Sequence, residues 1–492
     1  MSLRLYNTLS GLTEELAPRN GQPLGIYACG PTVYDYGHIG NFRTFIHVDI
    51  LRRFLRQQGV PLRHVMNITD VDDKIIRNAT AAGLSIYDYT PKYEQAFQED
   101  LKILRIEQPE FVARATEHIP EMVTLIEELV ARGSAYRGED GSYYFRIASF
   151  PEYGKLSKKD LSGMEDGARV DVDEYDKDSA RDFALWKAAK PGEFHWDTRL
   201  GTGRPGWHIE CSAMAMRYLG DSFDLHVGGE DLMFPHHENE IAQSESATGK
   251  TFARHWMHVR FLLVEGKKMS KSAGNFFTLR DLLLRGYKAS TIRFLLSSVP
   301  YRNPLNFTFD GLTESANAVE RLRSFVERLK NGRFPDGVNA ALTAATEKSQ
   351  ATFTAALEDD LNTAEARAAI FELVRAANTA ADRKELRNGD VEPILNVMAR
   401  FDEIFSVLGD HDEEATRFAL QWAEQEGRLD AATTEALAGY TLSDAEIDAR
   451  IAERNEARKS RNFARADAIR DELAAKGILM EDSKDGVRWR RK

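Results

Sequence analysis

Apolar and polar positions near the start of the chain follow first a strand period and then a helix period. Residues 24–29 form a short apolar run with strand-forming side chains, which Gly30-Pro31 ends. Residues 42–55 then place apolar side chains at helical spacing, and residues 62–68 form a second strand-like run. A strand–helix–strand unit of this kind predicts a parallel sheet with helices on its faces.

The same alternation is interrupted and then resumes further along the chain. Residues 115–200 are less regular, with Gly, Asp and Lys clusters at 155–160 and 163–178, and we interpret them as an insertion. The α/β pattern returns with a helix over 207–219, a strand over 223–227, a helix over 235–248 and a strand over 257–264. Ligands of such sheets bind beyond the carboxyl ends of the strands, where we expect Cys29, residues 32–41, Thr69 and Asp70.

The remainder of the chain is predicted to be mainly helical. Apolar spacing indicates helices over 312–330, 339–357, 364–381 and 391–408, which together predict a helix bundle. Residues 409–444 are acidic and weakly patterned, and we interpret them as a linker. Ser443 and Glu446 have the spacing of a capping box at the start of a small final unit. A hairpin is predicted at its end, between residues 477–478 and 487–489.

Composition narrows the class of protein. The 492 residues are 42% hydrophobic and 29% charged, an ordinary globular balance. No run reaches the roughly 20 apolar residues that cross a bilayer. Residues 1–12 lack the pattern of a secretion signal, so we expect a cytoplasmic protein without membrane contact. Its two cysteines, Cys29 and Cys211, are then expected to be reduced thiols, either buried small hydrophobic side chains or ligands.

The charge distribution limits how nucleic acid is bound. A net charge of −12 excludes binding by bulk positive charge but not by local basic surfaces. The C-terminal region has either such a surface or a solvated helix face, formed by Arg458, Lys459, Arg461, Arg465, Arg470, Arg488, Arg490, Arg491 and Lys492. Trp489, between two of these arginines, is either a platform for an unpaired base or part of a hairpin core.

Two segments have the chemistry of a nucleotide site. Gly37-His38-Ile39-Gly40-Asn41 lies between a predicted strand and a predicted helix, where glycines allow close approach and the helix N-terminus offers amide hydrogens to a polyphosphate. Residues 266–275 read GKKMSKSAGN, and their lysines can neutralise charge on the β- and γ-phosphates. Taken singly, the first segment is more often a plain glycine-rich turn, whereas an exposed basic loop is the less frequent alternative for the second.

A third group is typical of a metal site. Pro235 suits the first turn of a helix, and His236 and Glu240, four residues apart, then share one face while His237 points elsewhere. Cys29 and Cys211 would add sulfur ligands to a mixed set that suits Zn²⁺. The alternative for the His/Glu pair alone is a surface hydrogen bond, and the long spacing between the cysteines does not decide the matter.

These segments resemble those of a known family. Residues 268–272 resemble the KMSKS loop of class I aminoacyl-tRNA synthetases, and residues 38–41 resemble their HIGH element, with Asn41 in place of the second histidine. Further segments resemble cysteinyl-tRNA synthetases: CGPTVYD from Cys29, NITDVDDK from Asn67, GWHIECSAM from Gly206 and FPHHENE from Phe234. The resemblance runs from about residue 3 to the C-terminal tail.

The resemblance implies a reaction. L-cysteine would be activated with ATP to cysteinyl-adenylate, pyrophosphate would leave, and the 2′-hydroxyl of the terminal adenosine of tRNA(Cys) would take the cysteinyl group. We expect the catalytic residues to be His38, Asn41, Lys268 and Lys271, with Mg²⁺ accompanying ATP. The expected ATP-binding residues are Gly37, His38, Gly40, Asn41, Gly228, Gly229, Asp231, Lys268 and Lys271, and the expected substrate-binding residues are Thr69, Trp207 and His226.

The resemblance also implies one Zn²⁺ per chain. Its ligands would be Cys29, Cys211, His236 and Glu240. Bonding of the substrate sulfur to zinc would select cysteine over serine without an editing site, because a serine hydroxyl is less acidic and a harder ligand. The sequence leaves open whether the metal becomes five-coordinate or Glu240 yields its place.

With the resemblance, the fold is predicted as α/β. A Rossmann-like parallel-sheet catalytic domain with an inserted connective region would precede a helix bundle and a small mixed α/β C-terminal domain. Residues 1–114 and 201–310 would be the two halves of the catalytic domain, the second with the KMSKS loop, and 115–200 the connective region. Residues 311–410 would be the tRNA-binding bundle, and 411–492 a linker and anticodon-binding domain. We expect a monomer.

Two other functions remain open on sequence alone. A related ligase that transfers activated cysteine to an amino sugar would share the catalytic motifs, but it would have little use for an RNA-binding C-terminal region. A non-catalytic, zinc-dependent RNA-binding module would have no need of residues 268–272 and would show no amino-acid-dependent exchange between ATP and pyrophosphate.

Overall fold

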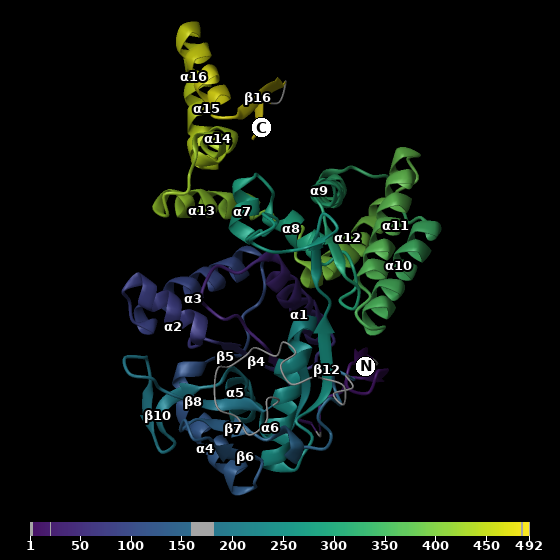
Figure 1. Ribbon diagram of the computed structural model, residues 1–492. Helices are drawn as coiled ribbons and strands as arrows, with labels where there is room; N and C mark the ends of the chain where they lie inside the picture. Colours follow the sequence, from purple (N-terminus) through teal and green to yellow (C-terminus); the bar gives the residue numbers. More distant parts are fainter. Residues whose placement is uncertain (1–2, 20, 159–181, 484–485, 492) are drawn as a thin grey trace.

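The computed structural model describes residues 3–19, 21–158, 182–483 and 486–491. Lys492 and most of the polar clusters at 155–160 and 163–178 lie outside them. The core is a parallel five-stranded sheet in the order β12-β11-β3-β4-β5, of which β12, β4 and β5 are labelled in Figure 1. Its strands are β3 (Leu24–Ala28), β4 (Leu62–Ile68), β5 (Phe111–Arg114), β11 (Phe223–Gly229) and β12 (Ala253–Val259). Every residue of β3 is buried, as expected for a parallel strand covered on both faces.

The order of the strands reverses beside β3. β4 and β5 follow on one side, whereas β11 and β12 join the other side after the insertion. The helices that accompany this sheet in the chain are α1 (Ile39–Gln57), α2 (Asp73–Ala82), α3 (Ile86–Ile103), α5 (Trp207–Leu219) and α6 (Glu238–Thr248). The predicted strand–helix–strand unit is confirmed as β3-α1-β4, and β3 and β11 end side by side at a switch point suited to a ligand.

The predicted insertion contains a helix and an antiparallel sheet. Helix α4 (Ile119–Ala131) precedes five strands in the order β6-β7-β8-β10-β9. They are β6 (Ala135–Arg137), β7 (Tyr143–Phe145), β8 (Phe183–Ala188), β9 (Trp196–Thr198) and β10 (Gly201–Pro205). Asp73 joins this sheet to the start of α2, because its carboxylate lies 2.9 Å from Lys187 Nζ and 3.1 Å from Arg204 Nη2.

The single strand predicted at 257–264 is wrong. β12 ends at Val259, and β13 (Leu262–Val264) belongs to a separate sheet with β14 (Lys267–Lys268) and β15 (Leu305–Phe307). The buried guanidinium of Arg43 lies at the break and binds the carbonyl oxygens of Arg260 and Phe261. The Arg260 carbonyl is therefore satisfied by a side chain distant in sequence, which apolar periodicity does not indicate.

The helical region begins beyond two short helices, α7 (Leu279–Leu284) and α8 (Ala289–Leu296). The four predicted helices are present as α9 (Phe309–Asn331), α10 (Ala340–Glu358), α11 (Thr363–Asp382) and α12 (Asn388–Phe405). A small antiparallel pair at the other end of the chain, β1 (Arg4–Asn7) and β2 (Leu12–Glu15), lies beside β12.

The segment interpreted as a linker, residues 409–444, contains helices that its weak sequence pattern did not predict. It contains α13 (Asp412–Gln425) and the short α14 (Ala431–Ala436). The carboxylate of Asp412 accepts hydrogen bonds from the Ser290 backbone N at 2.8 Å and Oγ at 2.7 Å, and it pairs with Arg323 Nη1 at 2.8 Å. Helix α13 is therefore fixed to both α8 and α9.

A small unit follows α13 at the far end of the molecule, shown in yellow in Figure 1. It consists of α15 (Asp444–Lys459), α16 (Phe463–Ala475) and the hairpin β16 (Ile478–Ser483) and β17 (Gly486–Arg491). The capping box of Ser443 and Glu446 and the hairpin are confirmed. Trp489 is half-buried against the small core of this unit, and its Nε1 donates to Asp448 Oδ1 at 2.8 Å. Arg465 is paired with Glu453 at 2.7 Å, so part of the basic run is neutralised locally.

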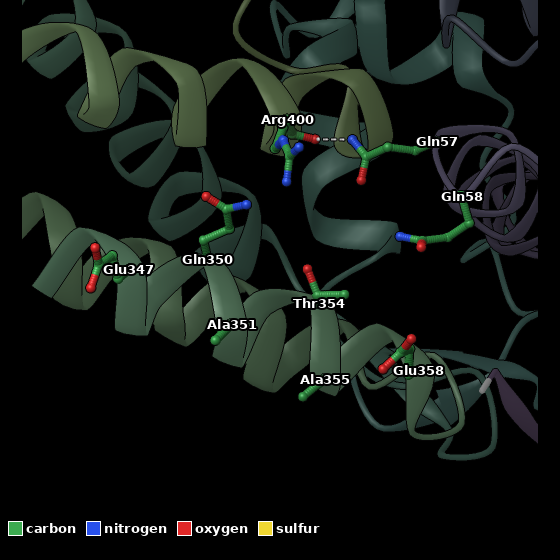
Figure 2. Close-up of a pocket in the computed structure, with 9 residues that line it drawn as sticks. All are labelled: Gln57, Gln58, Glu347, Gln350, Ala351, Thr354, Ala355, Glu358 and Arg400. Atoms are coloured by element: carbon green, nitrogen blue, oxygen red, sulfur yellow. Dashed lines mark hydrogen bonds between the residues drawn. The ribbon is translucent and has the colours of Figure 1, made fainter. Parts of the chain in front are cut away.

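A polar cleft of about 630 Å³ lies where the end of α1 faces α10 and α12 (Figure 2). Gln57 Nε2 donates to the Arg400 carbonyl at 3.3 Å within it. None of the residues that line the cleft is a predicted site residue. Among the described residues, no helix combines the length and the apolar character needed to cross a membrane.

Candidate active site

The four predicted metal ligands meet at the carboxyl end of β3. Cys29 follows that strand, Cys211 lies in α5, His236 lies in the turn before α6, and Glu240 lies in α6 itself. One ligand atom from each of the four lies within 4.8 Å of the others, and all four residues are buried. His236 Nε2 is 3.2 Å from Glu240 Oε1, so these two side chains do share one face.

The helix does not begin at Pro235, and the prediction that His237 points elsewhere is wrong. Phe234 has extended backbone dihedral angles that interrupt the helix within Met233–His237, and α6 begins at Glu238. His237 also enters the site, where its Nε2 lies 3.4 Å from Cys29 Sγ. A second group of four ligand atoms within 4.8 Å results, from Cys29, His226, His237 and Glu240.

Hydrogen bonds favour the first group as ligands and the additional histidines as their supports. His226 Nε2 lies 2.8 Å from Glu240 Oε2, and His237 contacts Cys29, as outer residues do when they orient metal ligands. His236 Nδ1 is 2.9 Å from a second imidazole, that of His208, which leaves Nε2 facing Glu240. The second group would instead leave the Cys211 thiol unused beside the metal.

Burial disfavours charge at this site in the absence of a cation. It raises the pKa of the Cys29 thiol well above its ordinary value, and Cys211 and Glu240 add to the effect. It also raises the pKa of Glu240 to about 7, against the attraction of His236. The pKa of His236 is lowered by the same burial. A cation would compensate the negative charge that deprotonated thiols and a carboxylate bring into this environment.

We expect metal retention to weaken as the pH falls below neutrality. Binding must displace the protons of Cys29, whose pKa is raised, and of Glu240, whose pKa is about 7, so the apparent affinity rises with pH. Equilibrium dialysis at a fixed zinc concentration, over a series of pH values from about 6 to 8.5, measures the effect. Constant metal content over that series would contradict the assignment of these two groups as ligands.

Residues 38–41 begin α1 through a reciprocal cap. His38 Nδ1 accepts a hydrogen bond from the Asn41 backbone N at 3.2 Å, and Asn41 Oδ1 accepts one from the His38 backbone N at 3.1 Å. Burial lowers the pKa of His38, and because Nδ1 is an acceptor, the neutral ring carries its proton on Nε2. No described residue accepts a hydrogen bond from Asn41 Nδ2. Both side chains thus keep an N–H donor.

The lysine-rich loop lies against this cap. Thr278, just beyond the loop, forms a backbone bridge with His38. Phe276 packs edge-on against the His38 ring, with 5.2 Å between the ring centroids. A Cβ added to Gly40 would lie 3.4 Å from Met269 Cε, so the loop also contacts the second glycine of the cap. The two predicted phosphate-binding segments are therefore neighbours.

The loop is organised by its own side chains. Asn275 Oδ1 accepts a hydrogen bond from the Ser270 backbone N at 2.9 Å, and its Nδ2 donates to the Lys268 carbonyl at 3.1 Å. The side chain of Lys268 is exposed. Lys271 Nζ forms an ion pair with Asp35 Oδ2, which raises the pKa of the ammonium group.

The end of β11 approaches both parts of the site. A Cβ added to Gly228 would lie 2.5 Å from His237 Cε1, so only glycine allows this close approach. Gly229 follows, and a Cβ there would lie 2.4 Å from Asp231 Oδ1. The Asp231 carboxylate opposes the lowering of the His38 pKa by burial, which places it within electrostatic reach of the cap of α1.

The predicted substrate-binding residues lie around the four predicted metal ligands, Cys29, Cys211, His236 and Glu240, which we call the metal group. The ring of Trp207 stacks on His236, with 4.2 Å between the ring centroids. His226 is fully buried in β11. Thr69 follows β4, and its Oγ1 donates to Glu210 Oε2 at 3.2 Å. Burial raises the pKa of Glu210 well above its ordinary value. The structure thus brings all the predicted site residues to one edge of the sheet.

Comparison with known proteins decides the family. Residues 15–317 match the tRNA synthetases class I (C) catalytic domain, 352–409 the DALR domain, and 443–490 the cysteinyl-tRNA ligase anticodon binding domain. A cysteine–tRNA ligase of Koribacter versatilis is 60% identical over 495 residues, with 100% of both chains covered. One of Solibacter usitatus is 56% identical over 492 residues, again covering 100% of both. The chain belongs to the cysteinyl-tRNA synthetase family.

Solved structures of other synthetases agree with this fold. A methionyl-tRNA synthetase of Mycobacterium tuberculosis in complex with methionyl-adenylate has a TM-score of 0.57 and 18% identity, covering 85% of this chain and 94% of that chain. The ternary LeuRS–tRNA–LeuAMS complex of Agrobacterium radiobacter has a TM-score of 0.56 and 11% identity, covering 82% and 87%. At such identities the likeness concerns the fold alone. It supports the α/β sheet with following helices that resemblance to the cysteinyl-tRNA synthetase family predicted.

Sequence reasoning missed the residues that surround the predicted ligands in this member of the cysteinyl-tRNA synthetase family. His237 Nδ1 lies 2.8 Å from Nε2 of His258, a residue of β12. His258 therefore supports His237, as His208 supports His236. The available signal was the clustering of histidines in the segments around Cys211 and Glu240. Asp35 lies in the CGPTVYD segment, whose pattern alone does not indicate a partner for its carboxylate.

Proposed function

We propose that the protein is a cysteine–tRNA ligase, which activates L-cysteine with ATP and transfers it to the terminal adenosine of tRNA(Cys). The observation that carries this proposal is the meeting of a buried Cys/Cys/His/Glu group and two phosphate-binding segments at one sheet edge. The full-length identity of 60% to a protein named cysteine–tRNA ligase supports it. On this proposal residues 311–410 bind tRNA, and residues 411–492 include the part that binds its anticodon.

Activation requires charge stabilisation rather than a strong base, because the cysteine carboxylate is already ionised at neutral pH. One of its oxygens attacks the α-phosphorus of ATP, and pyrophosphate leaves. His38 Nε2–H and Asn41 Nδ2 are donors held by the cap of α1, so they would bind phosphate oxygens with little rearrangement. The ammonium groups of Lys268 and Lys271 would stabilise the charge on the leaving pyrophosphate.

The backbone around these side chains would hold the rest of ATP, which enters with Mg²⁺. Gly37 and Gly40 flank His38 at the N-terminus of α1, where backbone amides face a bound anion. Gly228 and Gly229 allow close approach of the adenosine, and the carboxylate of Asp231 would accept hydrogen bonds from its ribose hydroxyls.

The residues at the end of β3 fit a zinc ion. Two thiols, one imidazole nitrogen and one carboxylate oxygen form a buried set of the kind that zinc prefers. When bound, Zn²⁺ would bind the substrate thiol as a thiolate, which a serine hydroxyl does not match. Trp207 and Thr69 would then close the pocket, and His226 would hold the carboxylate of Glu240.

Aminoacylation of total tRNA by the full-length protein, with each amino acid in turn, tests the proposal. We expect cysteine alone to charge tRNA and to support exchange of pyrophosphate into ATP. An amino-sugar acceptor is run alongside, because transfer of cysteine to the sugar and not to tRNA would identify the related ligase instead. Absence of any amino-acid-dependent exchange would indicate a non-catalytic RNA-binding protein.

A further inference from the structure

The ammonium group of Lys271 has a partner within the protein itself. Its partner, the carboxylate of Asp35, belongs to the segment between β3 and α1, so the ion pair connects the two segments assigned to ATP. The same ammonium lies 5.2 Å from the centroid of the Phe276 ring, and Phe276 packs on His38. The pair therefore holds the lysine beside the helix start where phosphates are expected.

Asp35 is next to a residue that contacts α13 and α7. Its Oδ1 accepts a hydrogen bond from the Tyr36 backbone N at 2.8 Å. The Tyr36 hydroxyl accepts one from Trp422 Nε1 of α13 at 3.2 Å, and the guanidinium of Arg280 lies 5.3 Å from the Tyr36 ring centroid. The direction of the carboxylate is thus set by the packed core around α13, whereas Lys271 belongs to an exposed loop.

The pair is accessible enough to be exchanged for another anion. The side chains of Lys271 and Asp35 are 58% and 35% exposed, respectively. Ion pairs with this exposure contribute little to stability, because water competes with the pair. A triphosphate carries several negative charges and would compete effectively for the same ammonium group.

We propose that Asp35 is a positioning residue, which holds Lys271 in the nucleotide-free enzyme and releases it to the triphosphate. The proposal rests on the proposed function, which makes ATP the ligand. An interaction that exists only in the nucleotide-free state opposes nucleotide binding by its own free energy. The ion pair between Asp35 and Lys271 forms again when pyrophosphate leaves. Asp35 therefore weakens the binding of both ATP and pyrophosphate, and it favours product release.

Asp35→Asn tests this inference, since it removes the charge but keeps the size and the acceptor for the Tyr36 backbone. Calorimetric titration of the full-length protein with the Mg²⁺ complex of the non-hydrolysable β,γ-imido analogue of ATP provides the affinity. We expect binding about 1.5- to 5-fold tighter than in the wild type, the range that an exposed ion pair allows. Inorganic pyrophosphate should gain affinity by a similar factor.

The same substitution in a Lys271→Met background separates the ion pair from simple repulsion between a carboxylate and phosphate. There we expect Asp35→Asn to leave the affinity for the ATP analogue unchanged. Equal tightening in both backgrounds, or weaker binding in the single variant, would overturn the proposal. Cysteine-dependent pyrophosphate exchange by the wild type is measured in parallel, because its absence would contradict the proposed function while the binding comparison still judges Asp35.

Discussion

Serine in place of Cys29 or of Cys211 is expected to remove bound zinc and cysteine activation together. Each substitution replaces a soft sulfur ligand by a hydroxyl that does not deprotonate at neutral pH, within a buried group of four. Loss of an outer supporting residue already weakens metal binding by about 10- to 100-fold, so loss of a ligand should exceed about 100-fold. Zinc content by elemental analysis and cysteine-dependent exchange of pyrophosphate into ATP measure the two effects.

Ser244→Ala is the matched control for these variants. Ser244 lies in α6, one turn beyond Glu240, and its buried hydroxyl has no hydrogen-bond partner among the described residues. This variant should keep both its zinc and its activity. Thermal unfolding of all three variants shows whether the fold is retained. A Cys29→Ser protein that keeps a full zinc complement and activates cysteine normally would refute the ligand assignment.

Alanine in place of Lys271 is expected to depress pyrophosphate exchange by about 10²- to 10³-fold, the usual effect of removing one group that stabilises transition-state charge. The substitution removes the ammonium group that lies beside the cap of α1 and that we assign to the leaving phosphates. Zinc content should not change, because Lys271 is not among the residues of the metal group.

Lys267→Ala is the control for this loop. Lys267 is also exposed, and it lies in β14, four residues before Lys271, but it has no assigned role in catalysis. Its exchange rate should remain close to that of the wild type. An unchanged rate in Lys271→Ala would remove this lysine from the mechanism, and it would leave Lys268 as the cation assigned to that step.

Periodicity predicted several elements whose buried side chains are large, but not α3 and α4, which also bury such side chains. The strand–helix–strand start and the bundle helices α9 to α12 were found in this way. Helix α13 was missed because its buried face consists largely of small residues, among them Ala415, Thr416, Ala419 and Ala423. Such residues give no clear apolar stripe within an acidic segment. The break at Arg260 was missed because Arg43, which binds its carbonyl, lies far away in the chain.

The sequence predicted the residues of the site where a motif contains side chains that can bind a metal or phosphate. It predicted less well the directions of those side chains, which depend on local backbone geometry. His236 and Glu240 were placed correctly relative to each other by their spacing. His237 was misplaced because the spacing argument considered only the helix face shared by His236 and Glu240, whereas Cys29 follows β3 and contacts His237 from another side. The ion pair of Asp35 with Lys271 joins segments that are distant in sequence, so no local sequence pattern predicts it.

The metal group draws Cys29 from before the inserted sheet and its other three members from after it. β11, which lies next to β3 in the middle of the parallel sheet, is also added only after that insertion. A chain still emerging from the ribosome, or one truncated within the insertion, therefore holds only Cys29 of the four members, and on the proposed ligand assignment it would not retain zinc. Ion capture would mark the moment at which the two halves of the nucleotide-binding sheet have joined.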